Sequence, residues 1–342
     1  MRRARLLRRL CVAGVLVCFV VVVLGAYVRL TAAGLGCPDW PGCYGHLTPH
    51  GAAASPQDLA AYATRPLEPG KAWHEMIHRY AAGTLVLIIV ALTICAIALR
   101  RQRLLSVPLT VALLGTVLVQ AVLGMLTVTW QLKPLIVTLH LLFGLTTLAL
   151  LWWLKLSLPE SSWNTRALHG AGRAGGGAPA ATPWRLAALG LAMLILQIAL
   201  GGWTSSNYAA VACPDFPTCQ GALLPHADFR HAFVLWHGLN INYEGGVLDA
   251  PARVAIHLSH RFGALLTALL LTLAALAVLR RRGLAAVRAR AWVLLAALVL
   301  QLTIGISMVI RGFPLWLATA HTAGAALLLL ATLALLRALS PR

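Results

Sequence analysis

The chain has 342 residues, of which 60% are hydrophobic and 11% charged, and its formal net charge is +19. This composition excludes an ordinary soluble domain and indicates a protein embedded in a lipid bilayer. The positive charge does not indicate a nucleic-acid partner. Lys and Arg lie in short clusters between long apolar runs, and no basic domain with interleaved aromatic residues exists outside those runs.

Eight apolar runs can each span a bilayer, which needs about 20 residues of helix. They lie near residues 11–30, 74–99, 105–127, 134–154, 185–205, 254–279, 291–310 and 314–336. Basic clusters occupy every second connection, so we expect both termini to be cytoplasmic and connections 31–73, 128–133, 206–253 and 311–313 to be outer loops. The sequence therefore predicts an all-α polytopic membrane protein with eight transmembrane helices. A signal peptide is the alternative for the first run, which has a basic start and small residues at Ala32 and Ala33.

Four landmarks of the first half return in the second half in the same order. Residues 36–43 (GCPDWPGC) return as residues 212–219 (ACPDFPTC), an offset of 176. The other offsets are 182 for His78-Arg79 and 181 for Gln120, Gly124 and His140, which return as His260-Arg261, Gln301, Gly305 and His321. This pattern predicts an internal duplication into two tandem four-helix bundles. We expect an N-terminal half at 1–169, a flexible cytoplasmic Gly/Ala-rich linker at 170–183 and a C-terminal half at 184–342.

Four histidines lie well inside apolar runs, each seven residues beyond a residue that marks the outer boundary: His78, His140, His260 and His321 follow Lys71, Lys133, Arg253 and Pro314. At 1.5 Å per residue, every histidine lies about 10 Å below that boundary. Two histidines at equal depth on neighbouring helices can ligate one haem iron. The natural pairs are His78 with His140, and His260 with His321. The alternatives are interhelical hydrogen bonds and, in the first half, a zinc site that includes a glutamate.

Glu75 is the only acid next to these histidines. It precedes His78 by three residues, so the two share a helix face. An ionisable group in a membrane helix is costly and is by default a functional hypothesis. The position that corresponds to Glu75 in the second half is His257, to which we assign no role. A duplicated scaffold with one altered site suggests two bound groups with different tasks.

Three arginines are candidates to bind the propionates of a haem. Arg79 and Arg261 directly follow a candidate ligand, and they could pair with propionates or equally with backbone carbonyls or another helix. Arg29, near the outer end of the first run, is a third candidate, with snorkelling to the interface as the alternative. We expect four other residues to serve close packing between helices: Gln120, Gly124, Gln301 and Gly305.

Two cysteine pairs lie in the outer loops, Cys37 with Cys43 and Cys213 with Cys219. Each pair encloses five residues that include two prolines, so the loop is short and stiff. An oxidising outer compartment favours one disulfide per pair. A redox-active dithiol is the alternative, and the two roles are compatible because a short loop can exchange with a partner thiol.

Together, the Glu-x-x-His-Arg motif at 75–79, the single histidines at 140, 260 and 321, and the paired-cysteine loops resemble the haem A synthase family over essentially the whole chain. The resemblance implies an oxidoreductase that converts the C8 methyl group of haem O into the formyl group of haem A by successive oxidations, for cytochrome c oxidase. Carried over by position, His78 and His140 hold haem O, His260 and His321 ligate a haem b cofactor, Glu75 is the essential acid, and Cys37 and Cys43 form the family's disulfide. The resemblance further implies a multi-pass cell-membrane protein with its haem ligands toward the outer face. Haem O synthase and cytochrome c oxidase assembly factors are the implied partners, and a homo-oligomer is compatible with the sequence.

Two other functions are compatible with parts of the pattern. A non-enzymatic membrane cytochrome that transfers electrons between two bis-histidine haems would need the histidines and the repeat, but it would not need to bury Glu75. A transporter built from parallel repeats would not need four histidines at one depth. The identity of the extracted haem would separate these functions from the enzyme.

Overall fold

The computed structural model describes residues 2–102, 104–158, 178–238 and 240–340. In this part of the chain, eight helices are long and apolar enough to cross a membrane, which confirms the predicted number. They are α1 (Arg2–Leu30), α4 (Pro69–Ala98), α5 (Val107–Thr129), α6 (Pro134–Ser157), α8 (Ala178–Ser206), α10 (Ala250–Leu279), α11 (Arg288–Ile310) and α12 (Leu315–Leu339). Pro69 and Pro134 each begin a helix, where the missing N–H of proline costs nothing.

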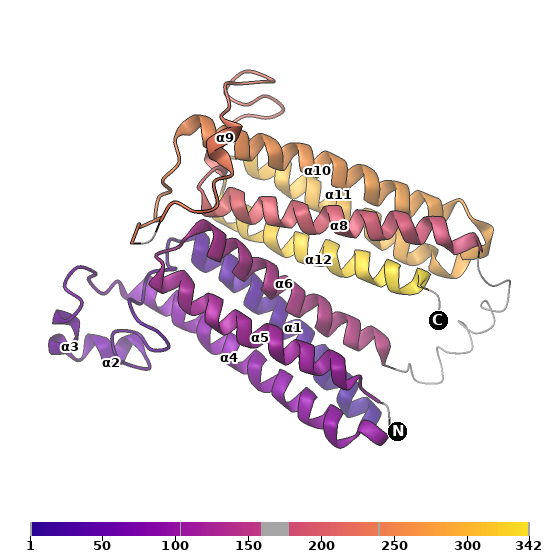
Figure 1. Cartoon of the computed structure of the whole chain (residues 1–342), viewed down its shortest axis with the longest axis horizontal. Coiled ribbons are helices and arrows are strands. Elements are labelled where there is room, and N and C mark those ends of the chain that lie inside the picture. The colour runs from indigo at the N-terminus through magenta and orange to yellow at the C-terminus, as the bar shows by residue number, and fades with distance from the viewer. Residues whose placement is uncertain (1, 103, 159–177, 239, 341–342) are drawn as a thin grey trace.

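The eight helices form two groups of four that lie side by side (Figure 1). In the first group, α1 and α5 each pack against both α4 and α6. In the second group, α8 and α11 each pack against both α10 and α12. The helices that carry the paired histidines, α4 with α6 and α10 with α12, therefore face each other diagonally across a group. We expected them to be neighbours in the bundle, and the structure corrects this.

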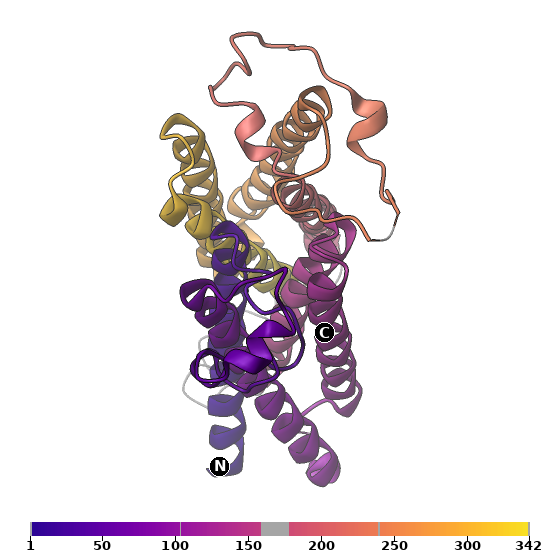
Figure 2. The same ribbon diagram turned by 90° about the vertical axis from the view of Figure 1, so that its left-hand side faces the viewer.

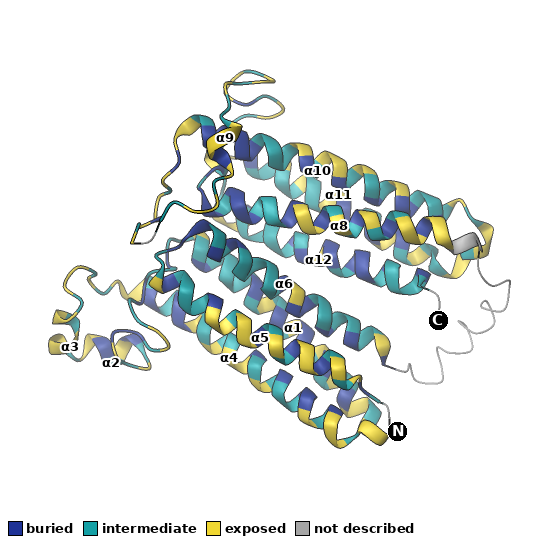
Figure 3. Ribbon diagram, viewed as in Figure 1, coloured by how far each residue is buried: buried dark blue, intermediate teal, exposed yellow. Residues whose placement is uncertain are grey.

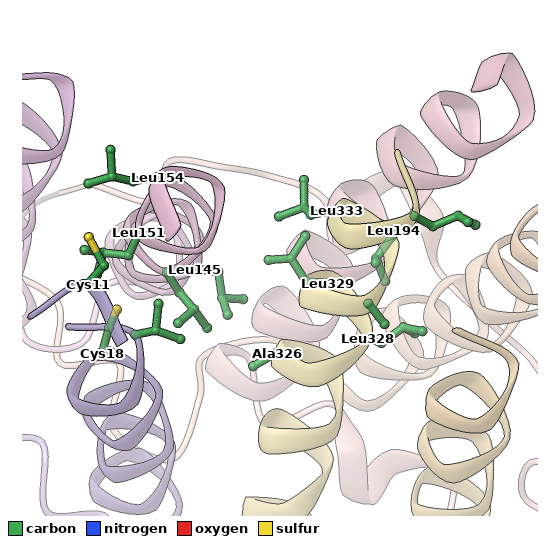
Figure 4. Close-up of a cluster of buried hydrophobic side chains, with 14 of the residues drawn as sticks. Cys11, Cys18, Leu145, Leu151, Leu154, Leu194, Ala326, Leu328, Leu329 and Leu333 are labelled. Carbon is green, nitrogen blue, oxygen red and sulfur yellow. The ribbon is translucent and has the colours of Figure 1, made fainter. Parts of the chain in front are cut away.

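A continuous apolar core joins the two groups. Leucines and small residues of α1 and α6 face those of α8 and α12, with Cys11 and Cys18 buried among them (Figure 4). Trp152 Nε1 crosses from α6 and donates to the Leu330 carbonyl of α12 at 3.0 Å. Helix α1 packs against α4, α6 and α12, so it contacts both groups.

The predicted linker differs from the structure at its end. Helix α8 begins at Ala178, so residues 178–183 are helical rather than a flexible tether. Ala180 and Ala181 are strong helix formers, and Pro179 lies in the first turn of the helix, where a proline is tolerated. Residues 170–177 of the predicted linker lie outside the described part of the chain.

Both long loops, residues 31–68 and 207–249, lie at one end of the helix groups, and we call this the loop end (Figures 1 and 2). They contain the short helices α2 (Pro49–Ala53), α3 (Pro56–Ala60), η2 (Ala210–Ala212) and α9 (Phe229–Ala232). Many of their residues are exposed (Figure 3). The chain termini and the turns η1 (Arg100–Gln102) and η3 (Arg282–Val287) lie at the opposite end (Figure 1).

Polar contacts fasten the two groups together at the loop end. Lys133 is only 1% exposed, and its Nζ donates to the Gly238 carbonyl at 2.9 Å while it lies 2.8 Å from the Trp236 ring centroid. The Tyr243 N–H donates to the Gln131 carbonyl at 3.1 Å. The loop of the second group is thus held on the α5–α6 turn of the first.

Candidate functional site

The structure brings the four histidines together in the two predicted pairs. The ring centroids of His78 and His140 lie 6.5 Å apart, and those of His260 and His321 lie 6.4 Å apart. An imidazole nitrogen binds a metal ion at about 2.0–2.1 Å. Two rings on opposite sides of one ion should therefore have centroids roughly 6.3 Å apart, with about 1.1 Å added from nitrogen to centroid. Both pairs thus have the ring separation expected if the two imidazoles held one metal ion between them.

Each histidine ring rests against a glycine of the preceding membrane helix. A Cβ atom built on Gly25, Gly124, Gly201 or Gly305 would lie 3.0, 3.4, 3.1 or 2.9 Å from Cε1 of His78, His140, His260 or His321, respectively. A side chain at Gly25, Gly201 or Gly305 would crowd the ring, because ordinary contacts between carbon atoms are about 3.5–4.0 Å, whereas one at Gly124 would come close to ordinary contact. The glycines thus create the space in which the rings lie, and the same arrangement occurs four times.

The surroundings of the histidines fit a haem better than a bare metal ion. Among the described residues, no group of three or more His, Cys, Asp or Glu side chains could hold a metal ion. The predicted zinc alternative with Glu75 therefore lacks its ligand set. Two imidazoles alone suit a planar haem, whose own nitrogens complete the coordination of the iron. The Nδ1 atoms of His78 and His140 are buried without a hydrogen-bond partner, so both rings are free to adopt the tautomer a haem needs.

Glu75 lies one turn before His78 on α4 and is 5% exposed. Its Oε2 accepts the Cys37 N–H at 2.9 Å, and its Oε1 accepts Arg79 Nη2 at 2.5 Å. Arg79 also donates to three carbonyls of the same loop, those of Asp39, Pro41 and Gly42. The acid is therefore held between the histidine helix and the first cysteine loop.

The second half repeats the arginine but not the acid. Arg261 donates to the carbonyls of Asp215, Thr218 and Pro217 at 2.7, 2.8 and 3.2 Å, so it clasps the second cysteine loop as Arg79 clasps the first. His257, at the position of Glu75, is buried and its Nδ1 lies 3.1 Å from the Ala209 carbonyl. These contacts are the backbone-carbonyl alternative to propionate binding, and the propionate role stays a prediction.

Arg29 reaches from α1 to the second group of helices. Its Nη2 donates to the Ser205 carbonyl at 2.8 Å, and its guanidinium lies 4.2 Å from the Tyr208 ring centroid. A cation at the last turn of α8 is favourable because that end of a helix carries negative partial charge. Arg29 therefore links the two groups, and its propionate role stays a prediction.

Both cysteine pairs are disulfides, Cys37–Cys43 at 2.04 Å and Cys213–Cys219 at 1.99 Å between sulfurs. An aspartate organises each loop. Asp39 accepts the N–H groups of Tyr44 and Gly45, and Asp215 has the equivalent bonds from residues 220 and 221. The Thr218 hydroxyl, followed by the Gly221 amide, holds the pKa of Asp215 below its ordinary value.

Comparison with known proteins assigns the family. Residues 8–333 match the model of a family described as cytochrome oxidase assembly protein, COX15-CtaA. The chain belongs to this family. It is similar to a heme A synthase of Shewanella oneidensis, with 41% identity over 318 residues that cover 91% of this chain and 89% of that protein. It is also similar to a heme A synthase of Caulobacter sp. (strain K31), with 33% identity over 147 residues, 43% of this chain and 39% of that protein.

Some site residues of this COX15-CtaA member escaped the sequence analysis. Gly25 and Gly201 hold histidine rings, and their offset of 176 (201 − 25) equals that of the cysteine pairs, which could have revealed them. Gln197 lies four residues before Gly201, just as Gln120 and Gln301 precede Gly124 and Gly305, and the same comparison would have found it. The contact of Glu75 with the Cys37 amide had no signal, because a backbone donor is not visible in side-chain identity.

Proposed function

We propose that the chain is a haem A synthase, which oxidises the C8 methyl group of haem O to a formyl group. His78 and His140 would hold the substrate haem O, and His260 and His321 would hold a resident haem b. The observation that carries the proposal is the pair of histidine sites of matched geometry, of which only the first has a buried acid one turn from a ligand. The 41% identity to a protein named heme A synthase supports it.

The reaction removes electrons and protons from a methyl carbon, and the chain's residues divide this work. The resident haem b, when bound, would supply one-electron transfer away from the first half. Glu75 is the group placed to accept a proton, because its carboxylate lies on the histidine face of α4. Arg79 and the Cys37 amide fix the two carboxylate oxygens, so Glu75 cannot swing away from the substrate site.

A substitution of Glu75 tests this role. Glu75→Gln keeps an oxygen that can accept the Cys37 N–H but removes the proton acceptor, so haem O should remain bound while haem A formation falls about 100–10,000-fold, the range for loss of an acid–base group. The matched control is His257→Gln at the equivalent position of the second half, which should retain much more activity. Haem extraction from the purified variants and separation of haems O and A measures both. Undiminished haem A formation by Glu75→Gln would remove the acid from the mechanism.

The buried acid also separates the enzyme from a simple electron carrier. A membrane cytochrome with two bis-histidine haems needs both histidine pairs, but it has no use for an ion pair between Glu75 and Arg79 in one half only. Burying such a pair costs desolvation energy, so it calls for a function. This asymmetry favours the oxidation of one haem over electron transfer through two.

We infer the orientation in the membrane from the positive charges. Five arginines among the first nine residues and the cluster at 280–282 lie at the end opposite the loops. Positively charged residues mark the cytoplasmic side. The termini would then be cytoplasmic, and the loop end with its disulfides would face the outside of the cell membrane. Haem O would come from a haem O synthase, and haem A would pass to assembly factors of cytochrome c oxidase.

A further inference from the structure

In the second half, a glutamine amide lies against each histidine ring. Gln197 Nε2 lies 3.0 Å from Nδ1 and 3.4 Å from Nε2 of His260, and it donates to the His260 carbonyl at 2.9 Å. Gln301 Nε2 lies 3.3 and 3.4 Å from the same two ring atoms of His321. Each glutamine comes from the helix that also supplies the ring's glycine, four residues earlier in the chain.

Two further glycines make room for these amides. A Cβ atom on Gly263 would lie 2.3 Å from Gln197 Oε1, and one on Gly324 would lie 2.2 Å from Gln301 Oε1. Both distances are too short for any side chain, so each amide lies in a notch of the histidine helix. In both amides the Oε1 atom is buried without a hydrogen-bond partner, and a buried acceptor of this kind is costly unless it is used.

The first half has no such contacts among the described residues. Position 21, four residues before Gly25, is a valine, so the ring of His78 has a backbone hydrogen bond to Val21 in place of a side-chain amide. Gln120 occupies the equivalent place on α5, with its Nε2 beside Gly144 and its Oε1 likewise buried without a partner, but the Nδ1 atom of His140 has no partner. The two halves thus share the histidines and their glycines but differ in what holds the rings.

We propose that Gln197 and Gln301 are positioning residues that lock the imidazoles of His260 and His321, so that the second half retains its haem while the first half releases its own. The proposal rests on the proposed function, in which one haem is a resident cofactor and the other is a substrate that must leave as product. A hydrogen bond to the second ring nitrogen of a metal-bound histidine fixes the ring and strengthens the ligand. His78 and His140 have no side-chain amide against their rings among the described residues, so we infer that they bind with less preorganisation.

The two glutamines act in different ways. A histidine that binds iron through Nε2 carries a proton on Nδ1 and needs an acceptor. The Gln301 side chain makes no other hydrogen bond in the described part of the chain, so a half-turn of its amide brings Oε1 to His321 Nδ1. Gln197 is tied to the His260 carbonyl through Nε2 and opposes such a turn. Gln301 should therefore tune the iron through its ligand, and Gln197 should mainly hold the orientation of its ring.

Haem release from the full-length purified protein tests the proposal. Protein from cells that make haem b as their only haem is mixed with excess apomyoglobin, and the transfer is followed by absorbance. Two phases are expected, and His78→Ala and His260→Ala assign the fast phase to the first half and the slow phase to the second. Gln197→Met and Gln301→Met should accelerate the slow phase about 10–100-fold, the usual effect of losing such a partner. Gln120→Met, the matched control, should leave both phases unchanged.

The midpoint potential of the second-half haem is a second measurement. A variant whose fold is merely less stable would not shift the potential of this one haem alone. A tenfold weaker preference for ferric iron in Gln301→Met raises the midpoint of the second-half haem by about 59 mV, and Gln197→Met should raise it less. Gln301→Glu keeps the side-chain length and the oxygen, so it should preserve the slow phase, and it carries the test if Gln301→Met does not accumulate. Three results would overturn the proposal. The slow phase could be unchanged in Gln197→Met and Gln301→Met, or Gln120→Met could accelerate haem release equally. Alternatively, Gln301→Glu could release haem as fast as Gln301→Met. Haem A formation from haem O is measured separately, so loss of the proposed function is distinguishable from failure of this inference.

Discussion

The glycines against which the histidine rings lie allow a prediction in which haem binding and helix stability change in opposite directions. In Gly305→Ala, the new methyl group would lie 2.9 Å from Cε1 of His321. Since carbon atoms pack at about 3.5–4.0 Å, the ring must move by roughly 0.6 Å or more. Gly124→Ala is the matched control, because its methyl group would lie 3.4 Å from His140 Cε1, close to ordinary contact.

The energy of this displacement can be bounded. Overpacking by one methyl group costs about 1–3 kcal/mol, which corresponds to a loss of roughly 5- to 150-fold in haem affinity if the strain falls on the bound state. The helix itself gains, because alanine is favoured over glycine in a helix by about 0.8–1.0 kcal/mol. We therefore expect Gly305→Ala to accumulate as folded protein but to lose haem. Gly25→Ala, at 3.0 Å from its ring, should behave like Gly305→Ala in its own half.

The assay is haem content per folded protein, titrated with added haem and followed by the absorbance of the low-spin bis-histidine form. Gly305→Ala should need a 5- to 150-fold higher haem concentration for half-saturation of its site, and Gly124→Ala should remain close to the unsubstituted protein. The reasoning is refuted if Gly305→Ala binds haem normally, or if Gly124→Ala loses as much affinity as Gly305→Ala.

Three other predictions follow from contacts at the loop end. Lys133→Met removes the cation from the Trp236 ring and the bond to the Gly238 carbonyl. A desolvated cation–π contact contributes about 2 kcal/mol, so limited proteolysis of loop 233–248 should be markedly faster. An unchanged rate would show that the two Lys133 contacts do not stabilise this loop. Arg79→Lys loses the fork that holds three carbonyls and Glu75, so dithiothreitol should reduce Cys37–Cys43 faster, with Cys213–Cys219 as the internal control; equal acceleration of both disulfides would contradict this. The hydrogen bonds to Asp215 lower its pKa from the ordinary 3.8, so their contribution to loop order is present above that value and is lost as the pH falls through the lowered pKa. Protease resistance of loop 212–222 should therefore fall only in strong acid, and in Asp215→Asn it should lose this pH dependence; a transition near pH 6 would argue against this role for Asp215.

The fold and the histidine pairs could be predicted because their signals are local. Hydropathy over about 20 residues identifies a spanning helix without reference to any other part of the chain. Equal spacing from boundary residues placed His78 with His140 and His260 with His321, and their ring separations agree with that pairing. Repetition of the motifs in two halves strengthened each weak signal.

The remaining features depend on which faces of the helices meet. The sequence indicated that Gly124 and Gly305 serve packing. Only the way in which neighbouring helices are aligned reveals that each glycine lies against a histidine ring. The diagonal placement of α4 and α6 is likewise a property of the assembled bundle. Arg79 and Arg261 bind loop carbonyls, which every residue carries, so side-chain identity could not separate these partners from a propionate.

The most direct test of the account is the identity of the haem lost with each histidine pair. The full-length protein, His78→Ala and His260→Ala are purified from cells that make haem O, and the extracted haems are separated and quantified. The account predicts that the unsubstituted protein contains haem b together with haem O or haem A. His78→Ala should lose haems O and A but keep haem b, and His260→Ala should lose haem b. Loss of the same haem from both variants, or haem b as the only haem in the unsubstituted protein, would contradict it.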